Sequence, residues 1–183
     1  MFDATALQAI ADELKEKVLH GRVQEIMQLD ALTFGFEIYA GHTRHYLYVS
    51  AHPEDARVHL ASQKLRGSGE APSAFLLLLR KYAEGAFVDS IAPLPHERVL
   101  RIAFDHSVEG ISTLVVETIG RYSNIILLDA DDVVVDSVKR VGAQVNRARV
   151  TLPKHKYAPP PAQDKLDPST LEPAKLARAL LDQ

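Results

Sequence analysis

Apolar side chains recur every three or four residues near the start of the chain, which is the repeat of a helix with one buried face. This stripe is formed by Leu7, Ile10, Leu14 and Val18. Asp3 stands at the expected N-cap, and Gly21 stands where a left-handed residue after the helix is expected. The pattern predicts a helix over residues 4–19.

Three runs rich in branched and aromatic residues come next. The second run, Phe34-Gly35-Phe36-Glu37-Ile38, alternates apolar positions with others, as a strand with one buried face does. Ala40-Gly41-His42 supplies a turn into the third run. We expect an antiparallel meander with strands over residues 22–29, 33–39 and 45–50.

A second helical pattern starts at Pro72, which suits the first position of a helix. Its apolar positions are Phe75, Leu76, Leu79 and Tyr82. Gly85 stands where a C-cap would end the helix. Arg80 and Lys81 lie near that end, where cations complement the helix dipole, so one interpretation of this pair is capping and solubility.

The pattern then returns to strands, which we expect over residues 86–91, 98–104, 112–118, 124–128 and 133–138. The acidic run Asp129-Ala130-Asp131-Asp132 favours a hairpin turn, because aspartates hydrogen-bond their own backbone. Two helices among eight strands predict an α+β fold, mostly an antiparallel β-sheet or sandwich.

The composition changes after Leu152, where prolines become frequent and oppose regular structure. We therefore divide the chain into a folded domain over residues 1–152, a proline-rich linker over residues 153–168 and a final segment over residues 169–183. A leucine-rich helix expected over residues 171–181 has no partner of its own. We interpret it as the start of a following helical module.

Composition limits the class of protein. The 183 residues are 46% hydrophobic and 25% charged, which fits one compact domain with a short appendage. Cysteine is absent, which excludes disulfides and thiolate zinc sites. No apolar run approaches the roughly 18 residues that a membrane span needs, and the N-terminus lacks the pattern of a signal peptide. We expect a soluble, cytoplasmic protein with no membrane partner.

The net charge of −3 argues against a polyanion partner, but its distribution is uneven. The segment from Lys139 to Lys156 holds no acidic residue. Its basic residues are Lys139, Arg140, Arg147, Arg149, Lys154 and Lys156. This segment is either a solvated basic loop or a contact surface for an anion.

The residues that enzymes use are not arranged for catalysis. There is no Gly-x-Ser-x-Gly nucleophile motif and no phosphate-binding loop around Gly67-Ser68-Gly69. The pair His42 and His45, and the group His52, Asp55 and His59, do not share one helical face, so neither is expected to hold a metal. We predict no catalytic residue, no metal site and no cofactor.

Two clusters can recognise a ligand. Glu97 and Arg98 open a predicted strand, and together they offer a carboxylate acceptor and a planar guanidinium fork, which can bind RNA. The alternative is a surface ion pair. The cluster from Gly120 to Asn124 combines a cation, Arg121, with an aromatic residue, and is equally a specialised turn in which Ser123 or Asn124 binds backbone groups.

Several motifs in this order resemble the N-terminal domain of the NFACT family, the ribosome quality-control factors also called fibronectin-binding protein A-like proteins. The resemblance extends from Phe2 to Lys165. It is carried by Phe2-Asp3, Ser50-Ala51-His52-Pro53, Arg57-Val58-His59, Leu79-Arg80-Lys81, Glu97-Arg98-Val99-Leu100, Gly120-Arg121-Tyr122-Ser123-Asn124-Ile125-Ile126-Leu127 and Pro160-Pro161-Ala162-Gln163-Asp164-Lys165.

The resemblance implies a non-catalytic module that binds tRNA, alanyl-tRNA in particular, and the large ribosomal subunit with its peptidyl-tRNA, and that directs C-terminal alanine tailing. It implies tRNA contacts at Asp3, Glu97 and Arg98. Glu97 departs from the family, which has an aspartate there. Contacts to the RNA backbone are expected from Arg80, Lys81, Arg121, Arg147 and Arg149.

The resemblance also implies a fold similar to the N-terminal domain of formamidopyrimidine DNA glycosylases, so a DNA-binding, glycosylase-like domain is one alternative. Those enzymes use an N-terminal proline, whereas this chain begins Met1-Phe2-Asp3. A fibronectin-binding adhesin is the other alternative. The preferred tRNA and the oligomeric state stay open at this point.

Overall fold

A computed structural model of the chain describes residues 3–145 and 149–161. The helices are α1 (Ala4–Val18) and α2 (Ala74–Ala83), and a 3-10 turn, η1, spans Gly120–Tyr122. The strands are β1 (Arg22–Asp30), β2 (Thr33–Ala40), β3 (Thr43–Ser50), β4 (Arg57–Ala61), β5 (Phe87–Pro93), β6 (Val99–His106), β7 (Gly110–Glu117), β8 (Asn124–Leu128) and β9 (Val134–Ser137). The predicted α+β class is confirmed.

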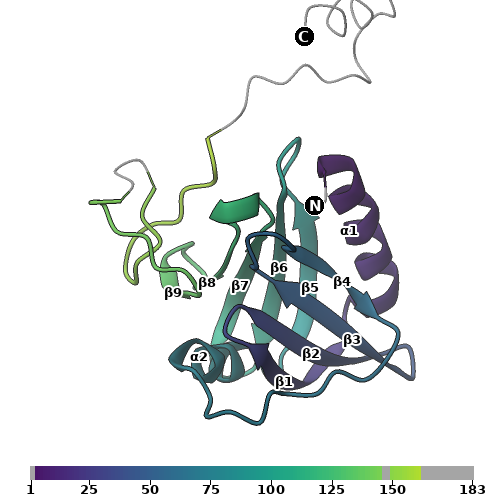
Figure 1. Cartoon of the computed structure of the whole chain (residues 1–183). Coiled ribbons are helices and arrows are strands. Elements are labelled where there is room, and N and C mark those ends of the chain that lie inside the picture. The colour runs from purple at the N-terminus through teal and green to yellow at the C-terminus, as the bar shows by residue number, and fades with distance from the viewer. Residues whose placement is uncertain (1–2, 146–148, 162–183) are drawn as a thin grey trace, which may run out of the picture.

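All nine of these strands form one antiparallel sheet in the order β4-β3-β2-β1-β5-β6-β7-β8-β9. The junction between β1 and β5 is short: the register pairs Arg22 with Phe87, and a few backbone hydrogen bonds flank this pair, such as that from the N–H of Val88 to the carbonyl of Gly21. The sheet therefore consists of two halves, β1–β4 and β5–β9. In Figure 1 the first half lies in front of β5 and β6, with α1 on the right and α2 at the lower left.

The main core lies between the two half-sheets. Phe36 of β2 and Phe104 of β6 stack with their ring centroids 6.2 Å apart, so the inner faces of the halves meet directly. Each helix contacts both halves: α1 packs on β2, β4, β5 and β6, and α2 packs on β1, β6, β7 and β9. The helices thus close the openings that the curved sheet leaves.

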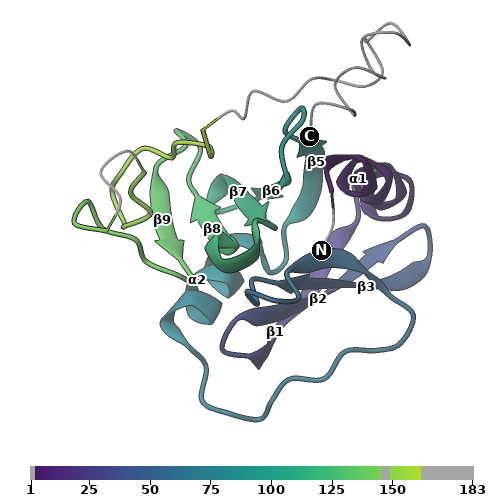
Figure 2. The same cartoon turned by 45° about the horizontal axis from the view of Figure 1, so that its top comes forward.

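A second, smaller core lies on the outer face of the β5–β9 half. Its buried residues are Val99, Val115, Ile126, Leu128, Val134 and Tyr157. Side chains alternate between the two faces of a strand, so Glu117 and Asn124, two residues from Val115 and Ile126, share this outer face. Tyr157 comes from the segment after β9, which in Figures 1 and 2 lies along β8 and β9 on the side away from α1.

The first helix follows the prediction at its start. Asp3 is the N-cap, and its carboxylate accepts a hydrogen bond from the backbone N–H of Ala6 at 2.7 Å. The prediction that Gly21 supplies the left-handed residue is wrong, because His20 has that conformation, with φ 60°. Gly21 is buried, and what it avoids is a steric clash: a Cβ there would lie 2.7 Å from Ala40 Cβ.

The second helix starts later than predicted. Its N-cap is Ser73, whose hydroxyl accepts from the N–H of Leu76 at 3.2 Å, so Pro72 precedes the helix. Gly85, with φ 86°, has the left-handed conformation expected after the last turn. Strand β4 was not predicted; it is a five-residue edge strand, too short for its alternation to stand out.

The first part of the expected linker packs against the sheet. The N–H of Val134 donates to the carbonyl of His155 at 2.8 Å, and the N–H of Lys154 donates to the carbonyl of Val134 at 2.9 Å. The N–H of Tyr157 donates to the carbonyl of Asp132 at 2.8 Å. Residues 162–183, which include the expected helix over 171–181, lie outside the described residues.

Replacing Gly21 with alanine is expected to destabilise the domain by roughly 2 kcal/mol, the usual cost of an added methyl in a packed site. The new Cβ would also lie 2.9 Å from the Val18 carbonyl oxygen, and backbone cannot move aside cheaply. Gly67→Ala is the matched control, since its nearest neighbour would be the Gln28 carbonyl oxygen at 3.5 Å. Urea unfolding measures both; equal midpoints would contradict the steric role of Gly21.

Candidate functional site

A cavity of about 540 Å³ opens near the end of β7, beside the outer face of the β5–β9 half. Three stretches of chain line it: the turn before β6, the region around η1, and the segment after β9. Its lining includes four of the residues predicted to bind RNA, namely Glu97, Arg98, Arg121 and Arg149. The fold therefore brings together charged residues that are far apart in the sequence.

The turn between β5 and β6 fixes the backbone of the first pair. The N–H of Leu94 donates to the carbonyl of Val99 at 2.9 Å, and the N–H of Glu97 donates to the carbonyl of Leu94 at 3.1 Å. The carbonyl of Arg98 accepts from the N–H of Thr118 at 2.9 Å, which ties this residue to the end of β7. Glu97 and Arg98 are half-buried at the cavity wall.

The η1 turn presents a cation and an aromatic ring together. Its backbone is closed by the N–H of Tyr122 on the carbonyl of Ile119 at 3.1 Å. The guanidinium carbon of Arg121 lies 4.7 Å from the centre of the Tyr122 ring. The Tyr122 side chain is 62% exposed, so an aromatic face is open to solvent at the cavity.

Asn124 connects β8 to the basic segment. Its side-chain oxygen accepts from the N–H of Lys139 at 2.9 Å, and its side-chain amide donates to the carbonyl of Lys139 at 2.8 Å. The same oxygen accepts from the N–H of Ile125 at 3.0 Å. This confirms the interpretation of the 120–124 cluster as a specialised turn, and shows that the turn also forms the cavity wall.

Lys139 links the cavity to the other half of the sheet. Its ammonium donates to the carbonyl of Ala51, in the loop after β3, at 2.7 Å. Burial lowers the pKa of Lys139. Sequence reasoning counted this lysine in the basic segment without assigning it to the site, because nothing local predicts that Asn124 holds it there.

Charge in the cavity is mostly positive. Among the described residues, its lining carries the cations Arg98, Arg121, Lys139 and Arg149 and one carboxylate, that of Glu97. One of these cations, Arg149, donates a hydrogen bond to the carboxylate of Glu117, which is buried and does not line the cavity. The site thus keeps a positive excess although the whole chain is acidic.

Two predicted cations do not reach this cavity. Arg80 donates through Nε to the carbonyl of Ile26 at 2.9 Å, and Lys81 pairs with Glu109 at 3.4 Å. Glu109 precedes the start of β7, whereas the cavity lies at the end of that strand. Both side chains thus bind neighbouring elements, which is a structural role different from the capping and solubility interpretation of this pair.

The remaining predicted residues lie elsewhere. Arg147 lies outside the described residues. Asp3 is exposed at the start of α1. In both views the first turn of α1 lies beside the end of β5, the strand that leads into the turn with Glu97 and Arg98 (Figures 1 and 2). Its carboxylate is engaged as the N-cap, and Asp3 does not line the cavity.

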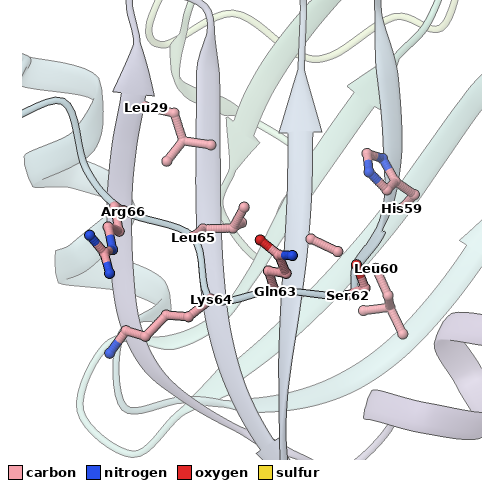
Figure 3. A pocket seen from close by; sticks show the side chains of 9 residues that line it. Leu29, His59, Leu60, Ser62, Gln63, Lys64, Leu65 and Arg66 are labelled. Atoms are coloured by element: carbon pink, nitrogen blue, oxygen red, sulfur yellow. The ribbon is translucent and has the colours of Figure 1, made fainter.

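A second, more open hollow lies on the outer face of the β1–β4 half. It is formed where residues 62–66 cross the strands, and Leu65 covers Gly35, so closely that a Cβ at Gly35 would lie 2.9 Å from Leu65. Lys64 extends away from Leu65, as Figure 3 shows, and pairs with Glu37 at 3.4 Å. None of the residues predicted to bind RNA lines this hollow.

Within residues 3–145 and 149–161 there is no group of three or more histidine and carboxylate side chains placed to hold a metal ion. Burial lowers the pKa of His59, whose ring centre lies 5.0 Å from that of Tyr48.

In the same described ranges, no helix has both the length and the apolar character needed to cross a membrane.

The fold and the cavity define an α+β domain with a cation-rich cavity. The sequence matches the family described as NFACT N-terminal and middle domains over residues 3–183. The chain belongs to the NFACT family, and the resemblance seen in its sequence motifs is confirmed.

Individual relatives agree with this assignment. The chain is 37% identical over 172 residues to a protein named Rqc2 homolog RqcH from Bacillus subtilis, covering 91% of this chain and 30% of the relative. It is 32% identical over 187 residues to the protein of the same name from Streptococcus pneumoniae, covering 100% of this chain and 34% of the relative. The chain thus spans about a third of the length of these curated relatives.

A solved structure is also similar. It is the N-terminal part of a fibronectin/fibrinogen-binding protein from Streptococcus suis, 32% identical, with a TM-score of 0.87. The match covers 100% of this chain and 70% of that one. The similarity extends to the whole fold.

Asn124→Asp is expected to destabilise the domain by roughly 2 kcal/mol, because a carboxylate oxygen would replace the amide that donates to the Lys139 carbonyl and would repel that oxygen, to which the hydroxyls of Ser137 and Thr151 also donate. Gln63→Glu, an exposed amide that becomes a carboxylate, is the matched control. Thermal and urea unfolding measure both variants. Equal stability of the two variants would show that Asn124 does not hold the basic segment.

Proposed function

We propose that the domain is the tRNA- and large-ribosomal-subunit-binding module of a ribosome quality-control factor, and that the cavity beside η1 is its RNA site. The observation that carries this proposal is the meeting of Glu97, Arg98, Arg121 and Arg149 in one cavity. Membership of the NFACT family supports it, as does the name Rqc2 homolog RqcH of two relatives.

The chemistry of the cavity suits an unpaired stretch of RNA. Arginine binds phosphate or a base edge through two parallel hydrogen bonds, and an exposed aromatic ring stacks on a base. Arg98 and Arg121 supply the first kind of contact, and Tyr122 supplies the second. Val141 and Val145 add apolar contact area, and Val145 is 82% exposed.

Glu97 gives the site a preference beyond charge. A carboxylate accepts hydrogen bonds from base amino groups and from the ribose 2′-hydroxyl, which DNA lacks. Glu97 beside Arg98 therefore discriminates RNA from other polyanions. The glutamate is one methylene longer than the aspartate of the family pattern, so its carboxylate can extend further from the backbone.

In this proposal the domain selects tRNA and performs no chemistry itself. It holds alanyl-tRNA at the large subunit that carries the stalled peptidyl-tRNA, and the ribosome forms the peptide bonds of the alanine tail. The work takes place in the cytoplasm. Because the chain spans about a third of the relatives, contacts from the rest of a longer protein add to the affinity.

Fibronectin binding is the second candidate, because the similar Streptococcus suis structure is described as a fibronectin/fibrinogen-binding protein. A DNA-directed, glycosylase-like role has no comparable support. The cation-rich cavity favours a nucleic acid over fibronectin, since nucleic-acid affinity depends mainly on neutralising phosphates. Glu97 favours RNA over DNA, because its carboxylate can accept from the ribose 2′-hydroxyl.

Arg98→Glu and Arg121→Glu are each expected to weaken binding of purified tRNA to the chain by at least about tenfold, because each removes a contact and adds a repulsive charge. Arg66→Glu is the matched control: an exposed arginine outside this cavity with the same change of charge. Fluorescence anisotropy measures affinity, and circular dichroism verifies folding. Arg98→Gln should also reduce the slope of log affinity against log salt concentration by about one, the contribution of one released counterion.

An equal loss of affinity in Arg66→Glu would show that binding is not localised at the cavity. Wild-type affinity in both cavity variants would overturn the site. Immobilised fibronectin serves as a parallel ligand, and retention of fibronectin without tRNA would favour the second candidate. In the whole gene product, Arg98→Glu should abolish co-purification of tRNA with split large subunits.

A further inference from the structure

Glu117 is a buried carboxylate that the proposed RNA contacts do not use. It is the last residue of β7, and the register places it between Val99 of β6 and Asn124 of β8. Its side chain is 0% exposed. Burial raises the pKa of Glu117, against the opposing charge and hydrogen bond of Arg149.

Both hydrogen-bond partners of Glu117 come from residues 149–161, which we call the strap. The hydroxyl of Tyr157 donates to Glu117 Oε1 at 2.8 Å, and the guanidinium of Arg149 donates to the same oxygen. Burial and the adjacent carboxylate raise the pKa of Tyr157, so its hydroxyl stays protonated and remains a donor.

Arg149 is held from two sides. Its Nε donates to the carbonyl of Ala158 at 2.8 Å while the other arm of the guanidinium reaches Glu117. The ring of Tyr157 lies near two guanidinium groups: its centre is 5.7 Å from the guanidinium carbon of Arg149 and 6.0 Å from that of Arg101. Glu117 therefore binds the start of the strap, at Arg149, and Tyr157 further along it. Backbone hydrogen bonds of Lys154, His155 and Tyr157 hold the middle of the strap on the sheet.

The strap also builds part of the cavity. Arg149, Thr151, Pro160 and Pro161 all line it, while Glu117 does not. The second oxygen of Glu117, Oε2, is buried without a hydrogen-bond partner among the described residues, which disfavours folding. An apolar residue would pack there without that cost, so packing alone does not account for a carboxylate.

We propose that Glu117 is a positioning residue of the RNA site: through Arg149 and Tyr157 it holds the strap so that the cavity is formed before RNA arrives. The inference rests on the proposed function. It predicts that Glu117 affects RNA affinity without touching RNA, because a preformed site avoids the cost of ordering its wall on binding.

The test is a double-mutant cycle on tRNA affinity in the 183-residue chain. Glu117→Gln and Arg149→Gln are each expected to weaken binding by about tenfold. If Glu117 acts through Arg149, the double variant loses about tenfold as well and not a hundredfold. Independent, multiplying losses would overturn the positioning role.

Tyr157→Phe serves where Glu117→Gln fails to fold. It keeps the ion pair and removes only the hydroxyl that donates to Glu117, and we expect a loss of about threefold in tRNA affinity. Wild-type affinity in folded Tyr157→Phe would overturn the proposal.

Asp132→Asn is the matched control. Asp132 pairs with Arg101 on the same face and accepts the backbone N–H of Tyr157, but it does not line the cavity. A purely structural role for Glu117 predicts that both variants lower the melting temperature and neither changes affinity below it. The positioning role predicts a loss of affinity in Glu117→Gln and none in Asp132→Asn.

Arg98→Glu, measured in parallel, separates the two proposals. Wild-type affinity in Arg98→Glu would remove the proposed RNA site itself. A loss in Arg98→Glu together with wild-type affinity in folded Glu117→Gln would leave the RNA site in place and overturn only the role of Glu117.

Discussion

The face-to-face packing of the two half-sheets is the interaction on which the rest of the structure depends. Phe36 and Phe104 stack across the middle, and the inner face of every strand is used there. Because β1 and β5 pair over only a few residues around Arg22 and Phe87, this core and the two helices help to hold the halves together. Each half is left with an outer face that needs its own cover.

The two outer faces are covered in different ways. On the β1–β4 half, residues 62–66 cross the strands and Leu65 sits on Gly35. On the β5–β9 half, the strap supplies Tyr157 to an apolar cluster and ends at a polar cavity. On this face of β8, Ile126 and Leu128 belong to the apolar cluster, whereas Asn124, the first residue of the strand, is polar and lines the cavity.

The sequence predicts most of the fold because alternation and helical repeats report directly on burial. Its failures have local causes. The β4 strand is a short edge strand, and residues 153–161 contain prolines that oppose regular structure without preventing packing. Gly21 was predicted to provide a left-handed backbone conformation, whereas its real role is to leave room for Ala40. Ala40 comes close to Gly21 only in the folded chain.

The sequence predicts a cluster of cations but not which residues belong to it. In the sequence, a cation near the end of a helix fits both capping and RNA binding. The hydrogen bond of Arg80 to the Ile26 carbonyl and its position outside the cavity become known only from the structure. Glu117 carried no signal at all. It is one glutamate at the end of an apolar strand, and its partners Arg149 and Tyr157 lie 32 and 40 residues further on.

The acidic net charge of the chain does not oppose an RNA site built in this way. Exposed charges further apart than about 10 Å are largely screened at 0.1 M salt, so the local balance governs the encounter with a polyanion. Glu117 compensates Arg149, which turns that arginine into an oriented donor more than a free positive charge. In the proposed function, Arg98, Arg121 and Glu97 together determine which polyanion the cavity binds.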